Sequence, residues 1–131
     1  MKDHVVFITG ASTGIGRATA IEFAKKGVHV AVCDINEEEG KNTCKLVEKE
    51  GVKTVFIHCN VAEPEACKHA VEKTLETFGR LDYAFNNAGI EGIWGDVANQ
   101  TIENWNKVID INLNGVFYCM HYQIPAMLNT G

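Results

Sequence analysis

The sequence predicts an α/β fold with a doubly wound parallel sheet, and two observations carry this prediction. Four short apolar runs, rich in β-branched or aromatic residues, alternate with four segments of helical period, which is typical of a parallel sheet wrapped by helices. The runs are also too apolar for strands with one face in water, so helices should cover both faces of the sheet. The predicted strands are residues 4–9, 28–33, 53–58 and 81–85.

The segments between the strands carry helix start and stop signals. They cover residues 14–26, 37–50 and 64–78, and a fourth segment begins near residue 101. Glycine follows the first three at positions 27, 51 and 79, where a left-handed residue commonly ends a helix. Asn36, followed three residues later by Glu39, resembles a capping arrangement, and Pro64 suits a first helical turn. Right-handed crossovers then favour the strand order 3-2-1-4, with a ligand site at the carboxyl ends of the strands.

Composition narrows the class of protein. The 131 residues are 46% hydrophobic and 22% charged, which indicates one soluble globular domain. The net charge is -5, and Lys and Arg are scattered, so we expect no nucleic-acid partner. No apolar run is long enough to cross a bilayer and no secretory leader is recognisable, so we expect a cytoplasmic protein without membrane contact. The five irregularly spaced cysteines should be reduced thiols, and no metal site is indicated.

A glycine-rich turn, TGASTGIG at residues 9–16, joins the first strand to the first helix. Gly10 allows a tight turn, Gly14 lets a ligand approach the backbone, and Gly16 permits contact between helix and strand. The free N–H groups of the helix start, together with the Ser12 hydroxyl, suit a pyrophosphate. With the predicted strand order, this turn indicates a dinucleotide-binding (Rossmann) fold. A structural turn without a ligand is the alternative.

An acidic residue follows the second strand, 18 residues after Gly16. A dinucleotide site needs a carboxylate there to accept hydrogen bonds from the adenine ribose, and Asp34 supplies it. Its charge would repel the additional phosphate of NADP, and the neighbouring Thr13 and Ile35 offer no cation. We therefore predict NAD as the cofactor. The alternative is a charge that only stabilises the start of the next helix.

Two further groups of polar residues are candidates for function. Residues 86–89, NNAG, follow the fourth strand, where small and amide side chains let the backbone pass close to a ribose and tie strands together. Asn112 interrupts an apolar stripe on the last helix, and a buried amide must be hydrogen-bonded or it costs about 1–3 kcal/mol. A core Asn bonded to backbone is the alternative. The residues of that stripe are Trp105, Val108, Ile109, Asn112 and Val116.

Together, the runs TGASTGIG, VCDI, CNV and NNAG resemble the short-chain dehydrogenase/reductase family over nearly the whole chain. The resemblance implies an NAD-dependent oxidoreductase that transfers a hydride between nicotinamide and an alcohol or carbonyl carbon. The match of INLNG to a family helix motif makes Asn112 similar to the asparagine that holds a water in the proton relay, and so the catalytic candidate. Asn60 departs from the family pattern, which most often has aspartate. The implied cofactor contacts are Gly10, Ser12, Gly14, Ile15 and Gly16 at the pyrophosphate, Asp34 and Ile35 at the adenosine ribose, Asn60 and Val61 at the adenine, and Asn87, Ala88 and Gly89 at the nicotinamide ribose.

The family's catalytic serine and its tyrosine with a lysine four residues on cannot be assigned in this sequence. We therefore expect residues 1–131 to be a dinucleotide-binding domain that is truncated before those residues and the later strands, and inactive alone. Its fourth strand should then have an unpaired outer edge. Two alternatives remain: a nucleotide-binding fragment without catalysis, and a methyltransferase that uses S-adenosylmethionine, which the NNAG run disfavours.

The expected partners are a small-molecule alcohol or carbonyl compound, whose identity the sequence leaves open, and other copies of the chain. The last helix carries outward apolar residues, including Phe117, Tyr118 and Met120, more than a free surface usually exposes. In the resembled family this helix pairs with its counterpart in a neighbouring subunit. The resemblance therefore implies a homodimer or homotetramer.

Overall fold

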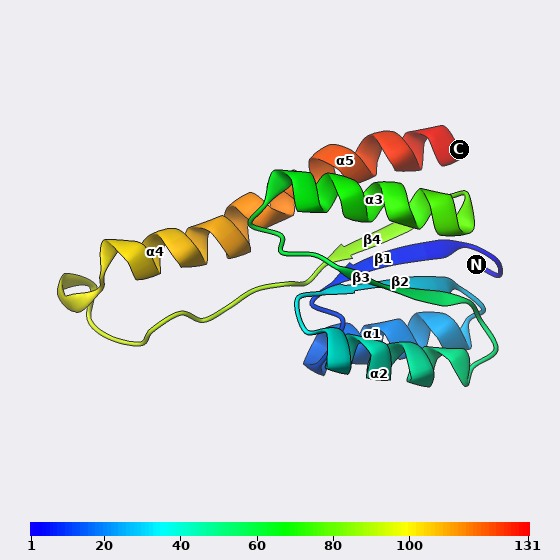
Figure 1. Cartoon of the computed structure of the whole chain (residues 1–131), viewed down its shortest axis with the longest axis horizontal. Helices are drawn as coiled ribbons and strands as arrows, with labels where there is room; N and C mark the ends of the chain where they lie inside the picture. The colour runs from blue at the N-terminus through cyan, green and yellow to red at the C-terminus, as the bar shows by residue number, and fades with distance from the viewer.

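The computed structural model describes all 131 residues and contains one parallel sheet with helices on both faces (Figure 1). The order of the strands is β3-β2-β1-β4, which confirms the predicted order. Every predicted strand is present, with ends that differ by no more than two residues. The strands are β1 Val5–Thr9, β2 His29–Asp34, β3 Thr54–His58 and β4 Tyr83–Asn86.

The helices form two layers around the sheet (Figure 1). Two helices lie side by side on one face and two on the other, while a further helix extends past the end of the sheet. The first layer is α1 Gly14–Lys25 and α2 Glu37–Glu48, the second is α3 Pro64–Phe78 and α5 Gly115–Thr130, and the extending helix is α4 Ile102–Ile109. No helix is both long enough and apolar enough to cross a membrane.

The predicted helix boundaries follow from local chemistry. The Asn36 side chain accepts a hydrogen bond from the Glu39 N–H at 3.1 Å, which is the predicted cap of α2. Gly27, Gly51 and Gly79 all have positive φ and end their helices as expected. The predicted end of α2 near residue 50 was two residues too late, since α2 ends at Glu48.

Strand β1 lies at the centre of the core. All five of its residues are buried, and successive side chains point to opposite faces of the sheet. Val5 and Phe7 join an apolar cluster with α3 and α5, while Val6 and Ile8 join a second cluster with α1 and α2. The five cysteines are free and buried, and all of them pack in these two clusters as small apolar side chains.

The prediction of one long last helix was wrong. A π-helical turn at Asp110–Asn114 separates α4 from α5, and no residue of α4 is buried. The predicted apolar stripe therefore forms no core face: the side chain of Trp105, for example, is 62% exposed. The physical reason is that α4 extends beyond the sheet and so has no sheet surface to pack on, and the wider π turn shifts the helical phase between the two helices (Figure 1).

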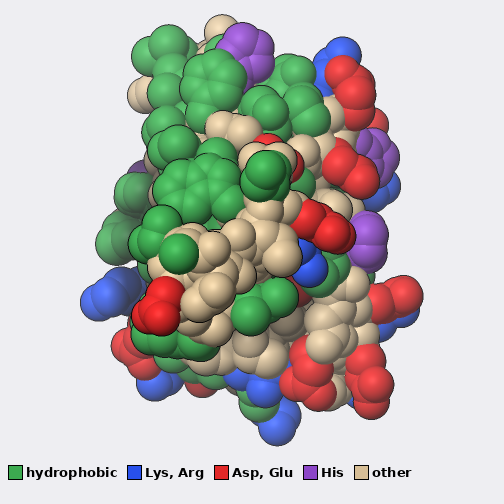
Figure 2. All heavy atoms as spheres, turned by 90° about the vertical axis from the view of Figure 1, so that its left-hand side faces the viewer, with side chains coloured by type: hydrophobic (Ala, Val, Ile, Leu, Met, Phe, Trp, Pro, Cys, Tyr) green, Lys and Arg blue, Asp and Glu red, His purple; other side chains and the backbone are tan.

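The outward surface of α5 agrees with the prediction in part. Phe117 is 58% and Met120 is 40% exposed, as expected. Tyr118 was predicted to point outward, but it is half-buried and packs against the apolar cluster that contains its neighbour Cys119. Figure 2 views the α4 end of the molecule, where hydrophobic side chains cover much of the surface. Strand β4 pairs only with β1 and forms an edge of the sheet, as expected.

A reciprocal pair of amides joins this edge to α5. Asn86 Nδ2 donates to Gln123 Oε1 at 2.9 Å, and Gln123 Nε2 donates to Asn86 Oδ1 at 2.8 Å. Gln123 is only 1% exposed, so its amide has almost no access to water. The sequence did not reveal this pair, because Gln123 lies on a helix and Asn86 at a strand end, 37 residues apart.

Replacing Gln123 by methionine should lower the free energy of unfolding by about 1–3 kcal/mol, because it leaves the Asn86 amide without its partner. Denaturant unfolding of the protein measures this. The matched control is Asn129→Met on the same helix, where the side chain is exposed and the change should stay within about 0.5 kcal/mol. Equal losses in the two variants would contradict the role of the pair.

Candidate cofactor site

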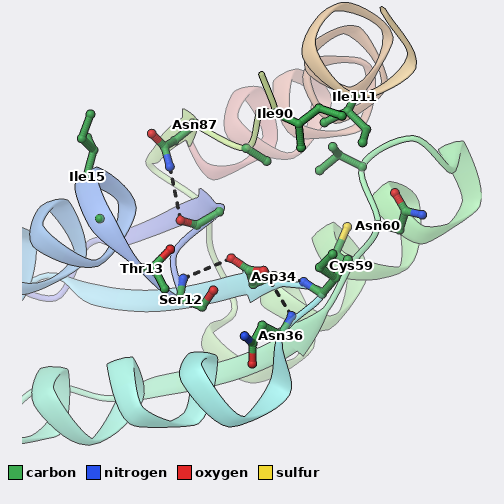
Figure 3. A pocket seen from close by; sticks show the side chains of 16 residues that line it. Ser12, Thr13, Ile15, Asp34, Asn36, Cys59, Asn60, Asn87, Ile90 and Ile111 are labelled. Carbon is green, nitrogen blue, oxygen red and sulfur yellow. Dashed lines mark hydrogen bonds between the residues drawn. The ribbon is translucent and has the colours of Figure 1, made fainter. Parts of the chain in front are cut away.

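A cavity of about 640 Å³ opens at the carboxyl ends of the strands (Figure 3). Eleven of the twelve residues predicted to contact a cofactor line it. The twelfth, Gly16, is buried and does not line the cavity. The lining residues are Gly10, Ser12, Thr13, Gly14, Ile15, Asp34, Ile35, Asn36, Cys59, Asn60, Val61, Asn87, Ala88, Gly89, Ile90 and Ile111.

The glycine turn has the geometry that its residues predict. Gly10 has φ +63° and Gly14 has φ +55°, conformations in which a side chain would be strained. At Gly16 a Cβ would overlap the carbonyl oxygen of Gly10 and lie 2.8 Å from Asn87 Nδ2. The start of α1 therefore lies directly against the end of β1, and the first N–H groups of the helix are at the cavity.

The turn after β4 is tied to β1 by side-chain hydrogen bonds, as its amides predicted. Asn87 Nδ2 donates to the carbonyl of Thr9 and to that of Gly10, each at 3.2 Å, and Figure 3 shows the bond to Gly10. The N–H of Ala88 donates to Thr9 Oγ1 at 3.0 Å. Gly89 lies beyond these bonds and is exposed. This end of the cavity is thus built from the ends of two neighbouring strands.

Asp34 lies at the end of β2, and its carboxylate holds the loop that surrounds it. Oδ2 accepts from the N–H of Ser12 at 3.1 Å, and Oδ1 accepts from the N–H groups of Ile35 at 2.7 Å and Asn36 at 3.2 Å (Figure 3). The carboxylate therefore stabilises the loop before α2 and also lines the cavity. Asp34 can stabilise the start of α2 and still accept hydrogen bonds from a ribose, because each carboxylate oxygen can accept more than one hydrogen bond.

No lysine or arginine lines the cavity. Arg17, the arginine nearest in the chain to the glycine turn, was not among the residues predicted from the sequence. Arg17 Nη2 lies 2.7 Å from Glu39 Oε2, and Arg17 Nε donates to Thr43 Oγ1 at 2.9 Å. Its guanidinium is thus neutralised by α2. The sequence could have predicted this ion pair, because Arg17 and Glu39 lie in the first turns of two helices that start at the same edge of the sheet.

The residues expected at the adenine lie after β3. Asn60 Oδ1 accepts from the N–H of Ala62 at 3.0 Å, so the side chain already supports a turn. Val61 is 6% exposed and packs on the start of α5, where a Cβ at Gly115 would lie 2.7 Å from Val61 Cγ2. Small residues at this contact bring α5 close to the cavity.

A group of buried thiols lies behind this part of the cavity. Cys119 Sγ lies 3.6 Å from Cys67 Sγ, and Cys67 Sγ donates to the carbonyl of Val61 at 3.5 Å. A hydrogen bond with Cys67 and burial raise the pKa of the Cys59 thiol, which lines the cavity. Cys59 therefore remains a neutral thiol at physiological pH and acts as part of an apolar wall.

Asn112 is not the buried amide that the sequence predicted. It lies in the exposed π turn, because α4 and this turn extend beyond the sheet. Both polar atoms of its side chain nevertheless bond to one residue: Oδ1 accepts from the N–H of Ile90 at 2.8 Å, and Nδ2 donates to the Ile90 carbonyl at 2.7 Å. Since Ile90 lines the cavity, Asn112 fixes the backbone at its edge.

Comparison with known proteins gives consistent matches. The sequence profile described as short chain dehydrogenase matches residues 4–131. The chain is 48% identical over 130 residues to cyclohexanol dehydrogenase of Acinetobacter sp. (strain SE19), covering 99% of this chain and 52% of that protein. It is 41% identical over 131 residues to 2,5-dichloro-2,5-cyclohexadiene-1,4-diol dehydrogenase of Sphingobium indicum, covering 100% of this chain and 51% of that protein.

A solved structure gives the same match in three dimensions. The crystal structure of NAD+-bound xylitol dehydrogenase superimposes with a TM-score of 0.95 at 30% sequence identity, covering 98% of this chain and 49% of that chain. The chain thus spans about half the length of the relatives that it matches.

Substitution of Gly16 by alanine should lower the free energy of unfolding by about 1–3 kcal/mol, because the new Cβ meets the Gly10 carbonyl, a backbone atom that cannot move aside. Thermal or denaturant unfolding measures the loss. Ala18→Ser, at an exposed position of the same helix, is the control and should have little effect. A Gly16→Ala protein as stable as this control would show that the close approach is unimportant.

Proposed function

The chain belongs to the short-chain dehydrogenase family, and from this premise we propose that it forms the cofactor-binding half of an NAD-dependent oxidoreductase. Membership of this family leaves no place for the methyltransferase alternative. The observation that best supports the proposal is the cavity at the strand ends, which is lined by the glycine turn and, beside it, by the Asp34 carboxylate. The pyrophosphate would lie at Gly14 and Ile15, and the adenosine ribose at Asp34 and Ile35.

The choice of NAD rests on charge. A 2′-phosphate on the ribose would add negative charge beside the Asp34 carboxylate, where no lining residue carries a positive charge. The guanidinium of Arg17 is already paired with Glu39 and hydrogen-bonded to Thr43. The relative described as NAD+-bound xylitol dehydrogenase supports NAD as well. At the adenine we propose contacts from Asn60 and Val61.

We propose a secondary alcohol on an apolar ring as the substrate class. Two relatives, at 48% and 41% identity, are named as dehydrogenases of a cyclohexanol and of a cyclohexadiene-diol. The relative named for xylitol, which is acyclic, is only 30% identical. Exposed apolar side chains, Ile93 and Trp94, follow the end of the cavity at Ile90. They offer the non-polar surface that a ring requires.

Bound NAD+ supplies the acceptor for the hydride that leaves the alcohol carbon. The residues of this chain that would hold the nicotinamide ribose are Asn87, Ala88 and Gly89, where the chain is tied to Thr9 and Gly10 by hydrogen bonds. Asn112 orients the backbone of Ile90 and, as the catalytic candidate, would hold a water in the path of the alcohol proton. The group that first accepts this proton is proposed to lie in the remainder of the enzyme.

We also propose that copies of the chain associate through α4 and α5 in a homodimer or homotetramer. The stretch from α4 to α5 exposes large apolar side chains, among them Trp105 on α4, Leu113 in the π turn and Phe117 on α5, each more than half exposed. Burial of such side chains against a second copy would remove a contiguous apolar surface from water.

The experiment that tests the function is an assay of the full-length protein with NAD+ and cyclohexanol, followed by the absorbance of NADH. We expect turnover with NAD+ and little with NADP+. The isolated 14.4 kDa chain should show none, because loss of general acid–base catalysis alone commonly costs about 10²- to 10⁴-fold in rate. Activity from a preparation whose intact mass matches the isolated chain would contradict the proposal that the proton-accepting group lies outside residues 1–131.

Cofactor preference gives a second prediction. Asp34→Ala combined with Ile35→Arg should shift binding toward NADP by at least about tenfold in the ratio of dissociation constants, because repulsion is replaced by attraction. Isothermal titration calorimetry with both cofactors measures the ratio. Ile102→Arg is the matched control, since Ile102 is 80% exposed and lies on α4, far along the chain from this end of the cavity. An unchanged ratio in the double variant would refute the role of charge at Asp34.

A further inference from the structure

Residues 90–100, which join β4 to α4, form a segment that we call the wall segment. Apart from a short 3₁₀ turn at Val97–Asn99 it has no regular secondary structure. It starts at Ile90, a lining residue of the cavity, next to the expected position of the nicotinamide ribose. Its large apolar side chains are among the most exposed of the chain: Trp94 is 85% and Ile93 is 69% exposed. A segment of this length at a site is commonly functional.

Side-chain amides hold the wall segment on α4. Asn104 Oδ1 accepts from the N–H of Ile93 at 3.0 Å, and Asn104 Nδ2 donates to Gln100 Oε1 at 2.6 Å. Gln100 Nε2 in turn donates to the carbonyls of Ile93 at 2.8 Å and Gly95 at 3.2 Å. Asn104 therefore bonds directly to Ile93, the residue before Trp94. It also supports the side chain of Gln100, which bonds to the residues before and after Trp94.

Gly92 lets the wall segment lie against α4, close to the Asn104 side chain. Gly92 has φ +75°, and a Cβ there would lie 2.6 Å from Val108 Cγ2 and 3.1 Å from Asn104 Oδ1. Only glycine allows the backbone to lie so close to α4 in this conformation. Two residues further on, the indole N–H of Trp94 adds a bond to Glu91 Oε2 at 3.1 Å. The wall segment is therefore seated on the helix.

We propose that Asn104 is a positioning residue, which holds the wall segment so that Ile93 and Trp94 form a ready-made apolar wall for the ring of the substrate. This inference rests on the proposed function. A wall that is ordered before the alcohol arrives saves the conformational entropy that binding would otherwise cost. Asn104 touches neither cofactor nor substrate in this arrangement and acts through the backbone of Ile93.

The test compares Asn104→Ala with Asn106→Ala in the full-length protein. Asn106 is a matched control, because it lies exposed on the same helix and its side chain makes no hydrogen bond. Amide hydrogen exchange within the wall segment should become at least about tenfold faster in Asn104→Ala and stay unchanged in the control. Asn104→Asp keeps an acceptor for the Ile93 N–H and should recover part of the protection.

The kinetic readout separates positioning from a general loss of structure. With cyclohexanol as the probe, Asn104→Ala should raise KM about 5- to 20-fold, while kcat and the dissociation constant of NAD+ stay within about twofold. Unchanged exchange in Asn104→Ala would overturn the inference whatever the activity, and so would faster exchange with an unchanged KM. If the unmodified protein does not oxidise cyclohexanol with NAD+, the proposed function fails and the substrate role of the wall with it, while the exchange result still reports whether Asn104 holds the segment.

Discussion

The close approach of Gly16 to the carbonyl of Gly10 is the constraint on which the candidate site depends. Because no side chain stands between them, the start of α1 lies directly at the end of β1. Asn87 enters the same space from β4 and bonds to the carbonyls of Thr9 and Gly10. Two consecutive elements, β1 and α1, thus meet a third, β4, that is distant in sequence, and the free N–H groups of the helix start lie at the cavity.

The negative charge of Asp34 lies beside the glycine turn and is held by a network of hydrogen bonds. Asp34 accepts from Ser12, the carbonyl of Ser12 accepts from Thr43 Oγ1 at 3.3 Å, and Thr43 accepts from Arg17. Glu39 completes the network as the partner of Arg17. The only arginine of the first two helices is therefore directed to α2. The structure thus combines a fixed acceptor for ribose hydroxyls with a lining that carries no positive charge, which is why one carboxylate is sufficient to set the proposed preference for NAD.

Residues whose conformation depends on their neighbours in the chain were predictable from the sequence. The apolar runs gave the strands, Asn36 and Gly79 gave helix ends, and right-handed connections gave the sheet order, since each of these follows from local chemistry or from a general rule of chain geometry. The glycine turn and Asp34 were found because parallel strands bring their carboxyl ends to one edge. The glycine turn and Asp34 therefore line the same cavity.

Residues whose environment depends on distant packing were not predictable. Helical periodicity assumes a surface to pack on, so it placed Asn112 in a core, although α4 and the π turn extend beyond the sheet. The same periodicity cannot show a π turn, which changes the number of residues per turn without a distinctive sequence. The Asn86–Gln123 pair depends on the exact placement of α5 against β4, and no spacing in the sequence reports that placement.

The two sides of the proposed active site therefore differ in how they are held. The cofactor side stands on β1, whose residues are all buried, so its geometry is fixed by the same packing that stabilises the domain. The proposed substrate side stands on α4, none of whose residues is buried, and is held by the side-chain amides of Asn104, which is half-buried, and Asn112, which is exposed. Exposed bonds contribute less to stability than buried packing does. Substitutions in the wall segment and α4 can therefore change the shape of the substrate side at little cost to the fold, which is the arrangement that a family with one cofactor site and many alcohols requires.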